Sequence, residues 1–225
     1  MSRPLNREKG KTRTLVLHSA TKLFIEKGYT NTRIKDIADD SGVGYNEIFR
    51  MFIDKDNLLS QLVNLVIEHQ FEMSVKYLND QASDELLLYI FECVLQLYIC
   101  EINDNIREMY AVSYSMPNTS QKIYDYITKK LENVFHKYLP EYETKDFYEL
   151  EIASAGIMRG YINMPCDMYF TMDRKVRRFL ETTFKIYEVS KEKIEESIKF
   201  VSKFDFKPIA KEVINSLFEY LNSRT

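Results

Sequence analysis

Three charged residues between positions 45 and 55 have side chains that suit the binding of nucleic acid. Arg50 and Lys55 can each neutralise one phosphate and release its counterions, which produces an affinity that falls as the salt concentration rises. Glu47 can accept a hydrogen bond from the amino group of cytosine, although a phosphate would repel it. On a surface that meets DNA, Arg50 and Lys55 would therefore give affinity, whereas Glu47 would either read a base or weaken binding.

Residues that could support catalysis or metal binding are spread too widely to form a recognisable site. His18, His69 and His136 fall in separate predicted helices, and each is interpreted as a packed or surface side chain. The three cysteines lack the paired spacing of a metal site, and the motifs of common hydrolases and of phosphate-binding loops are absent. We therefore expect no catalysis, no cofactor and no metal, while an enzyme whose site assembles only in the fold remains an alternative.

Two short helices separated by a tight turn are predicted to position the charged residues. The first spans Arg33 to Asp40, with Thr32 as its side-chain N-cap and apolar residues along its inner face. Gly42 follows where a helix commonly ends in a left-handed residue. The second helix spans Tyr45 to Met51 and directs Ile48 inward. Six residues then face the flanks or the outside: Tyr45, Asn46, Glu47, Phe49, Arg50 and Met51. This is the pattern of a helix-turn-helix, whose second helix lies in the major groove.

The elements on either side of this pair have the order found in one family of bacterial regulators. Arg13 to Gly28 has the periodicity of an amphipathic helix, and a long helix is predicted to begin near Asp56. Over roughly Arg13 to Leu62, the chain resembles the TetR family of transcriptional regulators. The residues that carry the resemblance are Ala20, Leu23, Phe24, Gly28, Tyr29, Thr32, Asp36, Ile37, Ala38, Gly42, Val43, Ile48, Phe49, Phe52, Lys55, Leu58 and Leu59.

The resemblance implies a contact role for individual residues of the helix-turn-helix. Tyr45 and Glu47 fall where family members touch bases, and Phe49 and Arg50 fall where they usually contact the sugar-phosphate backbone. Lys55 falls at a phosphate contact. The expected DNA-binding residues are Thr32, Arg33, Gly44, Tyr45, Asn46, Glu47, Phe49, Arg50 and Lys55.

Four positions depart from the family pattern. Gly44 stands where serine or threonine commonly caps the recognition helix, a change that costs roughly a few tenths of a kcal/mol. Asn46 replaces a small residue and Met51 replaces a histidine or tyrosine. The resemblance therefore specifies the base contacts less closely than it specifies the helix itself. Arg33 replaces a hydroxyl residue and would exchange a neutral phosphate contact for a charged one.

Charge is distributed unevenly along the chain. Residues 1–55 contain eleven lysines and arginines against seven aspartates and glutamates, a balance of +4; the whole chain carries −3, which leaves −7 for the remainder. A basic head of this kind suits a polyanionic partner. Five cations lie near the start of the chain: Arg3, Arg7, Lys9, Lys11 and Arg13. They are interpreted either as a solvated end or as a flexible arm that follows the DNA backbone.

Helical periodicity continues from residue 56 onward, with no alternating strand pattern. The predicted helices span 56–78, 83–102, 104–114, 118–139 with Asn118 or Thr119 as cap, 144–164, 172–187, 190–203 with Ser190 as cap, and 208–221 with Pro208 at its first position. We therefore expect an all-α protein, with a three-helix DNA-binding domain at 1–55 and a larger helical effector-binding and dimerisation domain at 56–225.

No segment is predicted to cross a membrane. The apolar run from Leu86 to Cys100 is too short to span a bilayer and is interrupted by Glu92 and Gln96, so it is predicted to be a core helix. The chain also lacks the pattern of a secretion signal, and we expect a cytoplasmic protein with no membrane partner.

The resemblance further implies that the helical body binds a small molecule and forms a homodimer. Aromatic and methionine side chains would give an adaptable apolar lining for an effector, although residues of these types are more often simply core. The candidate lining residues are Phe91, Tyr98, Met109, Tyr110, Tyr114, Met158 and Tyr161. Dimerisation is expected through the helix at 144–164, which carries several small residues, together with the final helices.

These expectations combine into a repressor with two states. A dimer presents two recognition helices to one face of duplex DNA and so predicts a palindromic operator. Binding of an effector would shift the helix at 56–78, change the spacing of the two heads and release the operator. The alternative is a helical protein-interaction module without sequence-specific DNA binding, which explains the body but leaves the basic head unexplained.

Overall fold

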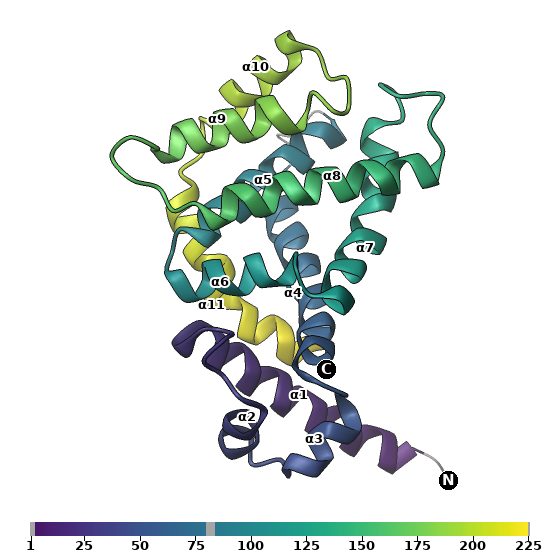
Figure 1. Ribbon diagram of the computed structural model, residues 1–225, viewed down its shortest axis with the longest axis vertical. Helices are drawn as coiled ribbons and strands as arrows, with labels where there is room; N and C mark the ends of the chain where they lie inside the picture. The colour runs from purple at the N-terminus through teal and green to yellow at the C-terminus, as the bar shows by residue number, and fades with distance from the viewer. Residues whose placement is uncertain (1–2, 80–83, 225) are drawn as a thin grey trace.

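The computed structural model describes residues 3–79 and 84–224, and every regular element in these ranges is an α-helix. The prediction of an all-α protein is confirmed. The helices are α1 (Arg3–Lys27), α2 (Ile34–Ser41), α3 (Tyr45–Met51), α4 (Lys55–Leu78), α5 (Glu85–Cys100), α6 (Asp104–Ser113), α7 (Pro117–Phe135), α8 (Thr144–Asn163), α9 (Met172–Thr183), α10 (Lys191–Val201) and α11 (Phe206–Arg224). Figure 1 shows α2 and α3 at one end of the long axis and α9 and α10 at the other.

The first three helices close around a small apolar core. Phe24 of α1, Ile37 of α2 and Ile48 of α3 are fully buried and belong to the same hydrophobic cluster. The turns between these helices are made by Gly28 (φ +84°) and Gly42 (φ +68°), in the left-handed conformation that costs glycine least. Both glycines end a helix where the sequence predicted, so the position of α3 against α2 follows from local chemistry.

Helix α4 carries the chain from the first three helices, which we call the head, into the helices that follow, which we call the body. Its N-cap, Asp54, accepts a hydrogen bond from the main-chain nitrogen of Asn57 at 2.7 Å. Only residues 52–54 separate the end of α3 from the start of α4. Because this connection is short, a displacement of α4 would also move α3.

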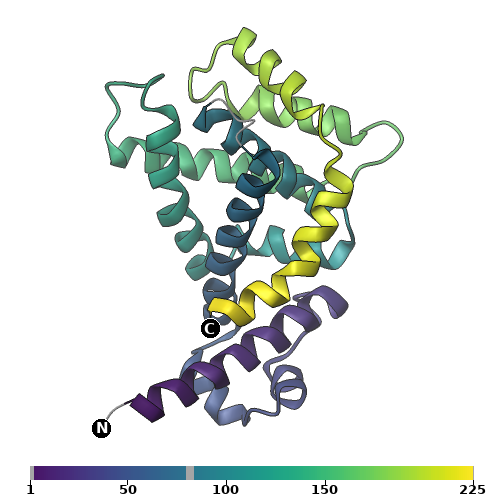
Figure 2. The same cartoon turned by 180° about the vertical axis from the view of Figure 1, so that it is seen from behind.

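Helix α5 forms the centre of the body, because nearly all of its residues are buried. Helices α4, α7, α8, α9, α10 and α11 pack against it. Helix α11 runs back along the molecule until it lies against α1, so the C-terminal helix contacts both the head and the body (Figure 2). None of the described helices has the length and apolar character that crossing a bilayer requires.

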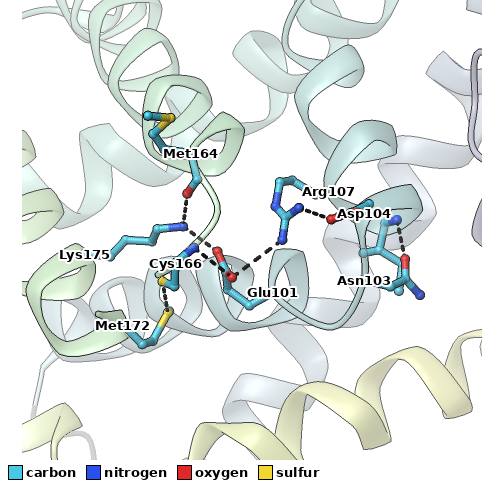
Figure 3. A network of polar contacts seen from close by, with 9 residues as sticks. Glu101, Asn103, Asp104, Arg107, Met164, Cys166, Met172 and Lys175 are labelled. Carbon is cyan, nitrogen blue, oxygen red and sulfur yellow. Dashed lines mark hydrogen bonds and ion pairs between the residues drawn. The ribbon is translucent and has the colours of Figure 1, made fainter. Parts of the chain in front are cut away.

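A fully buried lysine fixes the segment that joins α8 to α9. The ammonium of Lys175 donates to Glu101 Oε1 at 2.5 Å and to the carbonyl of Met164 (Figure 3). The other carboxylate oxygen of Glu101 accepts from the main-chain nitrogen of Cys166 at 3.2 Å and lies 3.6 Å from Arg107 Nη2. Because these partners come from four parts of the chain, Glu101 holds the end of α5, the start of α6, the 164–171 loop and α9 together.

The structure corrects the start of the first helix. Helix α1 begins at Arg3, ten residues before the predicted start at Arg13. The backbone of the basic segment is therefore helical from residue 3 onward, and the hypothesis of a flexible arm is wrong for these residues. The apolar periodicity that locates a helix in a sequence is lost where a helix extends beyond its packed core.

Two helix starts in the body also differ from the predictions. Helix α7 begins at Pro117 after Met116, so Asn118 and Thr119 lie inside its first turn and do not cap it. Helix α11 begins at Phe206, which puts Pro208 in the first turn, where a missing N–H still costs no intrahelical bond. The predicted start of the second body helix at residue 83 lies outside the described residues, and α5 itself begins after its N-cap Asp84.

Candidate nucleic-acid interface

Helix α3 has one buried face and one exposed face. Ile48 on the inner face is fully buried, and Phe52, which follows the helix, is 1% exposed. On the outer face Tyr45 is 49% exposed and Phe49 is 40% exposed, and their ring centroids are 4.8 Å apart. Side chains four residues apart on a helix lie side by side. The two rings therefore form a continuous aromatic surface that no part of the described chain covers.

The polar residues of α3 lie beside this aromatic pair. Asn46, Glu47 and Arg50 are exposed, and none of their side chains forms a hydrogen bond or ion pair within the described part of the chain. Gly44 is the N-cap of α3, and the space around its α-carbon is open. Free donors and acceptors on an exposed helix are the features that a DNA-reading surface requires.

Arg33 lies next to this surface at the start of α2. It is the N-cap residue of α2, and its guanidinium Nη2 lies 3.1 Å from Asp36 Oδ1. Its side chain remains 78% exposed, so it can still reach a phosphate. Asp36 also accepts a hydrogen bond from the main-chain nitrogen of Arg33 at 2.8 Å. The arginine is thus held at the helix end by a carboxylate that offsets part of its charge.

Thr32 does not have the predicted role. Its side chain is fully buried, and its hydroxyl donates to the carbonyls of Gly28 at 2.8 Å and Leu23 at 3.2 Å. The prediction that Thr32 caps α2 through its side chain is wrong, and its hydroxyl does not face solvent, where DNA would lie. Thr32 instead ties the start of α2 to the end of α1. The sequence could not show this, because the accepting carbonyls become available only when the chain folds back at Gly28.

Lys55 is also turned toward the protein. Its ammonium donates to the carbonyls of Tyr29 at 2.8 Å and Thr32 at 3.0 Å, and it lies 4.0 Å from the centroid of the Tyr29 ring. Burial lowers the pKa of Lys55, and burial raises the pKa of Tyr29 to about 12. The predicted phosphate contact is therefore replaced in this structure by contacts to the α1–α2 loop. Lys55 acts as a positioning residue that joins the start of α4 to the head.

Other charges of the head are paired within it. Asp40 accepts hydrogen bonds from Lys22 Nζ and Ser19 Oγ, each at 2.7 Å, and these bonds hold the pKa of its carboxyl below the usual value. Lys35 and Arg50 are exposed and take part in no ion pair in the described ranges. The net charge of the head counted from sequence thus overstates the number of cations that are available to DNA.

Residues 16–62 match the family of bacterial regulatory proteins named tetR. The matched span holds the C-terminal part of α1, the whole of α2 and α3, and the first part of α4, which are the elements that present the exposed face of α3. The chain belongs to the TetR family. Its general function is therefore DNA-binding transcriptional regulation.

The TetR-family assignment agrees with similarity to individual regulators. The HTH-type transcriptional regulator AcrR of Shigella flexneri is 28% identical over 182 residues, covering 72% of this chain and 80% of AcrR. An HTH-type transcriptional repressor of Mycobacterium tuberculosis is 36% identical over 72 residues, which span 32% of this chain and 36% of that repressor. The regulator YvkB of Bacillus subtilis is 26% identical over 118 residues, which span 52% of this chain and 59% of YvkB.

The body of this TetR-family protein contains a small internal cavity between α4, α5, α7, α8 and α9. Its volume is about 30 Å³, which is roughly the space of one water molecule. Two of the seven predicted pocket residues, Tyr114 and Met158, line it. The full lining is Ile67, Tyr89, Glu92, Cys93, Gln96, Tyr114, Ile127, Glu151, Ser154, Ala155, Met158, Phe179 and Thr183.

The other five predicted pocket residues lie elsewhere. Phe91 and Tyr98 pack against Phe206, with ring centroids 4.7 and 5.2 Å from it. Met109 and Tyr110 are buried, and the Tyr110 hydroxyl donates to Gln70. Tyr161 packs against aromatic rings of α9 and of the 164–171 loop.

The sequence contains a signal for this cavity. Glu92 and Gln96 are four residues apart in an otherwise apolar helix, so they must share one face of it. Polar side chains that are forced into a core usually converge on one another or on a ligand. The other polar residues of the lining, Glu151, Ser154 and Thr183, lie on α8 and α9, and sequence spacing cannot reveal that convergence. Among the described residues, no group of three or more histidine, cysteine, aspartate and glutamate side chains could hold a metal ion.

Proposed function

We propose that this TetR-family protein is a homodimeric repressor that binds a palindromic operator through α3 and leaves it when a small molecule binds in the body. The observation that carries the DNA-binding part is the outer face of α3. Its aromatic pair and its three polar side chains are exposed at one end of the molecule and have no internal partners among the described residues. A surface of this shape and chemistry fits a major groove.

The proposed contacts differ from those expected from the sequence. Tyr45, Asn46 and Glu47 are proposed to reach base edges, whereas Arg33, Phe49 and Arg50 contact the sugar-phosphate backbone. The open space at Gly44 allows the DNA backbone to approach closely. Thr32 and Lys55 leave the contact set and support it from behind.

The boundary between the two proposed domains falls at adjacent residues that face opposite ways. The side chain of Lys55 contacts the head, as described above. The side chain of Asp56 contacts the body, where its carboxylate accepts from Thr119 Oγ1 at 2.7 Å and from the main-chain nitrogen of Asn118 at 3.0 Å. These contacts support a DNA-binding domain at 1–55 and an effector-binding domain at 56–225, joined tightly at the start of α4.

The same contacts suggest how an effector reaches the DNA-binding surface. Helix α7 has no side-chain cap of its own, and Asp56 of α4 satisfies the free N–H groups of its first turn. Helix α7 also lines the cavity through Ile127. A ligand that displaces α7 would therefore pull on the start of α4, which is bonded through Lys55 to the α1–α2 loop. An effector must bind the two states with different affinity for this movement to release DNA.

Dimerisation is proposed through α8 and the 164–171 loop. Ile152, Met164, Met168 and Tyr169 are large apolar side chains exposed by 46% to 80% in this region. Between them the exposed face of α8 carries Gly156, with open space around it, which would let a second helix approach closely. Helix α11, which the sequence also favoured, instead packs against α1, α4 and α5 and exposes mainly charged and polar residues. The final helix is therefore left out of the proposed interface.

A DNA-binding measurement tests the proposed function. Duplex fragments selected from the native genome by the wild-type protein would be titrated over a range of salt concentrations. We expect Arg50→Ala to weaken binding roughly tenfold and to reduce the slope of log affinity against log salt by about one, because one phosphate contact is lost. Arg174→Ala removes an exposed arginine of α9, far from the head, and should change neither quantity. An unchanged slope in the Arg50 variant would show that the contact face is assigned wrongly.

The same titration separates the alternative function. A helical interaction module would show no salt-dependent binding to any selected duplex, and its partner would compete for the body. The exposed apolar loop at 164–171 is the feature that such a partner would use.

A further inference from the structure

Two carboxylic acids are buried in the same internal cavity of the body. Glu92 on α5 is 4% exposed and Glu151 on α8 is 3% exposed, and both line the cavity. Burial of a carboxylate is costly unless hydrogen bonds or a cation compensate for the lost hydration. Two such groups at one cavity therefore require an explanation beyond packing.

The protein offers these carboxylates few partners. Glu92 accepts from Gln70 Nε2 at 3.3 Å, and Glu151 accepts from Ser154 Oγ at 2.7 Å. Neither forms an ion pair with a lysine, arginine or histidine that the structure describes. The positive charge of Lys130 on α7 acts on Glu92 through space, but its ammonium lies against the Phe71 ring, 3.8 Å from the ring centroid. The cavity thus has an excess of acceptors over positive charge.

A second polar group in the cavity wall also lacks a partner. Thr183 on α9 is 1% exposed, and its hydroxyl makes no hydrogen bond within the described part of the chain. Buried hydroxyls are nearly always bonded in native proteins, and one that is not commonly faces a ligand or a water. Thr183 is therefore an independent sign that something polar belongs in this cavity.

The rest of the lining is apolar and adaptable. Ile127, Met158 and Phe179 face the same space, and methionine adjusts to irregular shapes at low cost. An anion would find no charge partner there, because the lining contains two carboxyl groups and no lysine, arginine or histidine. The lining matches a molecule with a positively charged nitrogen and a small apolar substituent.

We propose that this cavity is the effector site and that its ligand is an organic amine, held as the ammonium ion between Glu92 and Glu151 with Thr183 accepting a further N–H. The role of the amine as effector rests on the proposed function, whereas the binding of the amine itself does not depend on DNA. An ammonium supplies the donors and the charge that the cavity lacks.

The acid-base state of the cavity gives the proposal a second signature. Burial raises the pKa of Glu92 to about 7, and burial, then the nearby charge of Glu92, raises the pKa of Glu151 to about 8. In the empty protein near neutral pH, protons therefore reside on the pair, and an ammonium ion would displace them. The titratable groups around the pair are Tyr89 and Cys93 on α5, Tyr110 and Tyr114 at α6, Lys130 and Tyr126 on α7, and Tyr187 after α9. Burial raises the pKa of each of these tyrosines and of Cys93, so they stay neutral in the relevant range.

The size of the cavity links binding to movement. A volume of about 30 Å³ accommodates an ammonium group but not the substituent attached to it. An amine must therefore push apart α5, α7 and α8, and α7 is the helix whose N-terminus is bonded to Asp56. Binding of the amine would therefore be accompanied by a shift of α4.

Calorimetric titration of the full-length protein tests the proposal. The probes are 1-butylamine and 2-phenylethylamine, each compared with the alcohol of the same shape, 1-butanol and 2-phenylethanol. We expect at least one amine to bind more tightly than its alcohol, with proton release and with affinity rising between pH 6 and pH 8 by up to about tenfold per pH unit for each proton released. Equal binding of amine and alcohol, or binding of neither amine, would overturn the proposal.

Isosteric variants locate the site. Glu151→Gln and Glu92→Gln should each weaken amine binding by roughly ten- to a hundredfold, since each removes one charge-assisted hydrogen bond. Glu149→Gln removes an exposed carboxylate two residues away on the same helix and should leave amine binding unchanged. If a variant fails to fold, as judged by circular dichroism, the remaining glutamine variant and the pH dependence of the wild type decide the matter. Amine binding that neither glutamine variant weakens would overturn the assignment to this cavity.

A parallel DNA titration keeps the two proposals apart. If the wild type binds selected duplexes but no amine binds, the inference fails and the proposed function stands. If amines bind as expected but no duplex does, the site is supported and the proposed function fails. If both bind but a saturating amine leaves the affinity for DNA unchanged, the amine is not the effector and that part of the inference is overturned.

Discussion

At the scale of the residue, two side chains expected on the DNA-binding surface turn inward. Thr32 bonds to carbonyls at the end of α1, and Lys55 bonds to carbonyls of the α1–α2 loop. Both carry donors, and folding brings unpaired carbonyls near them before any DNA is present. Because a buried carbonyl without a partner is costly, intramolecular bonds take precedence over intermolecular ones. The residues still matter for DNA binding, through the position of α2 and α3.

Replacement of Lys55 tests this structural role. We expect Lys55→Met to lower the free energy of unfolding by about 1 to 2 kcal/mol, because the carbonyls of Tyr29 and Thr32 lose their donor. Urea denaturation followed by circular dichroism would measure the change. Lys35→Met, which removes an exposed and unpaired lysine on α2, should leave stability nearly unchanged. Equal stability of the two variants would mean that the Lys55 contacts contribute nothing.

Glu151 gives a prediction about pH. Its pKa is about 8 in the folded protein against 4.5 for the unperturbed group, so between these values the folded chain holds a proton that the unfolded chain has lost. The free energy of unfolding should therefore decrease as pH rises from about 4.5 to about 8, by at most about 1.4 kcal/mol per pH unit for this group. Glu151→Gln should flatten this decrease, and Glu149→Gln should not. Urea denaturation at pH 5, 6.5 and 8 would detect the difference, and parallel pH profiles for all three proteins would contradict it.

At the scale of the element, the start of α7 is capped by a residue of another helix, α4. Met116 provides no side-chain acceptor, and the acceptor comes instead from Asp56, sixty residues earlier in the chain. Asp56 accepts from two main-chain nitrogens and two side chains of α7, and it is 7% exposed. This arrangement makes the junction of α4 and α7 rigid. It also makes α7 the helix best placed to pass a movement in the body to the head.

Removal of this carboxylate should have a measurable cost. We expect Asp56→Ala to destabilise the protein by about 2 kcal/mol, since it removes a helix cap and leaves the buried hydroxyl of Thr119 with only the longer bond, 3.3 Å, to the main-chain carbonyl of residue 56. Asp125→Ala, which removes an exposed aspartate from α7 itself, should change stability by less than about 0.5 kcal/mol. Thermal and urea unfolding would compare the two. A small effect at Asp56 would argue against rigid coupling at this junction.

At the scale of the whole molecule, the proposed DNA-binding surface and the proposed dimer surface lie on different parts of an elongated protein. Helix α3 is at one end, whereas α8 and the loop that follows it lie away from that end (Figure 1). Helix α11 contacts both the head and the body, with His69 of α4 bonded to the carbonyl of Val213 at 3.1 Å and His18 of α1 packed against Phe218. This separation allows two copies to associate through the body while both heads stay free to meet DNA.

A single substitution on each helix distinguishes the possible dimer surfaces. Gly156→Arg should favour the α8 helix in the monomer but block close approach of a second copy, so we expect a monomer in sedimentation and at least about tenfold weaker operator binding. Asn215→Arg, on the exposed side of α11, should leave a dimer. A monomeric Asn215 variant together with a dimeric Gly156 variant would move the interface to α11.

Local chemistry made much of the head predictable. Gly28 and Gly42 end helices because glycine adopts the left-handed conformation at low cost, and the apolar residues Ile37 and Ile48 mark the buried face of α2 and α3. The ends of α3 and the exposed set on its outer face follow from the same periodicity. The all-helical body was also predictable, because each of its helices repeats apolar residues at helical spacing.

Only the tertiary structure decided which polar groups meet. The partners of Thr32, Lys55 and Asp56 lie four to sixty-three residues away in the chain, and the convergence of Glu92 and Glu151 joins two helices that are not neighbours in sequence. Periodicity reports the face on which a side chain lies, whereas hydrogen bonds and ion pairs depend on which faces are brought together. The sequence therefore determined the helices and the exposed face of α3, and the packing of those helices determined the cavity and its acidic chemistry.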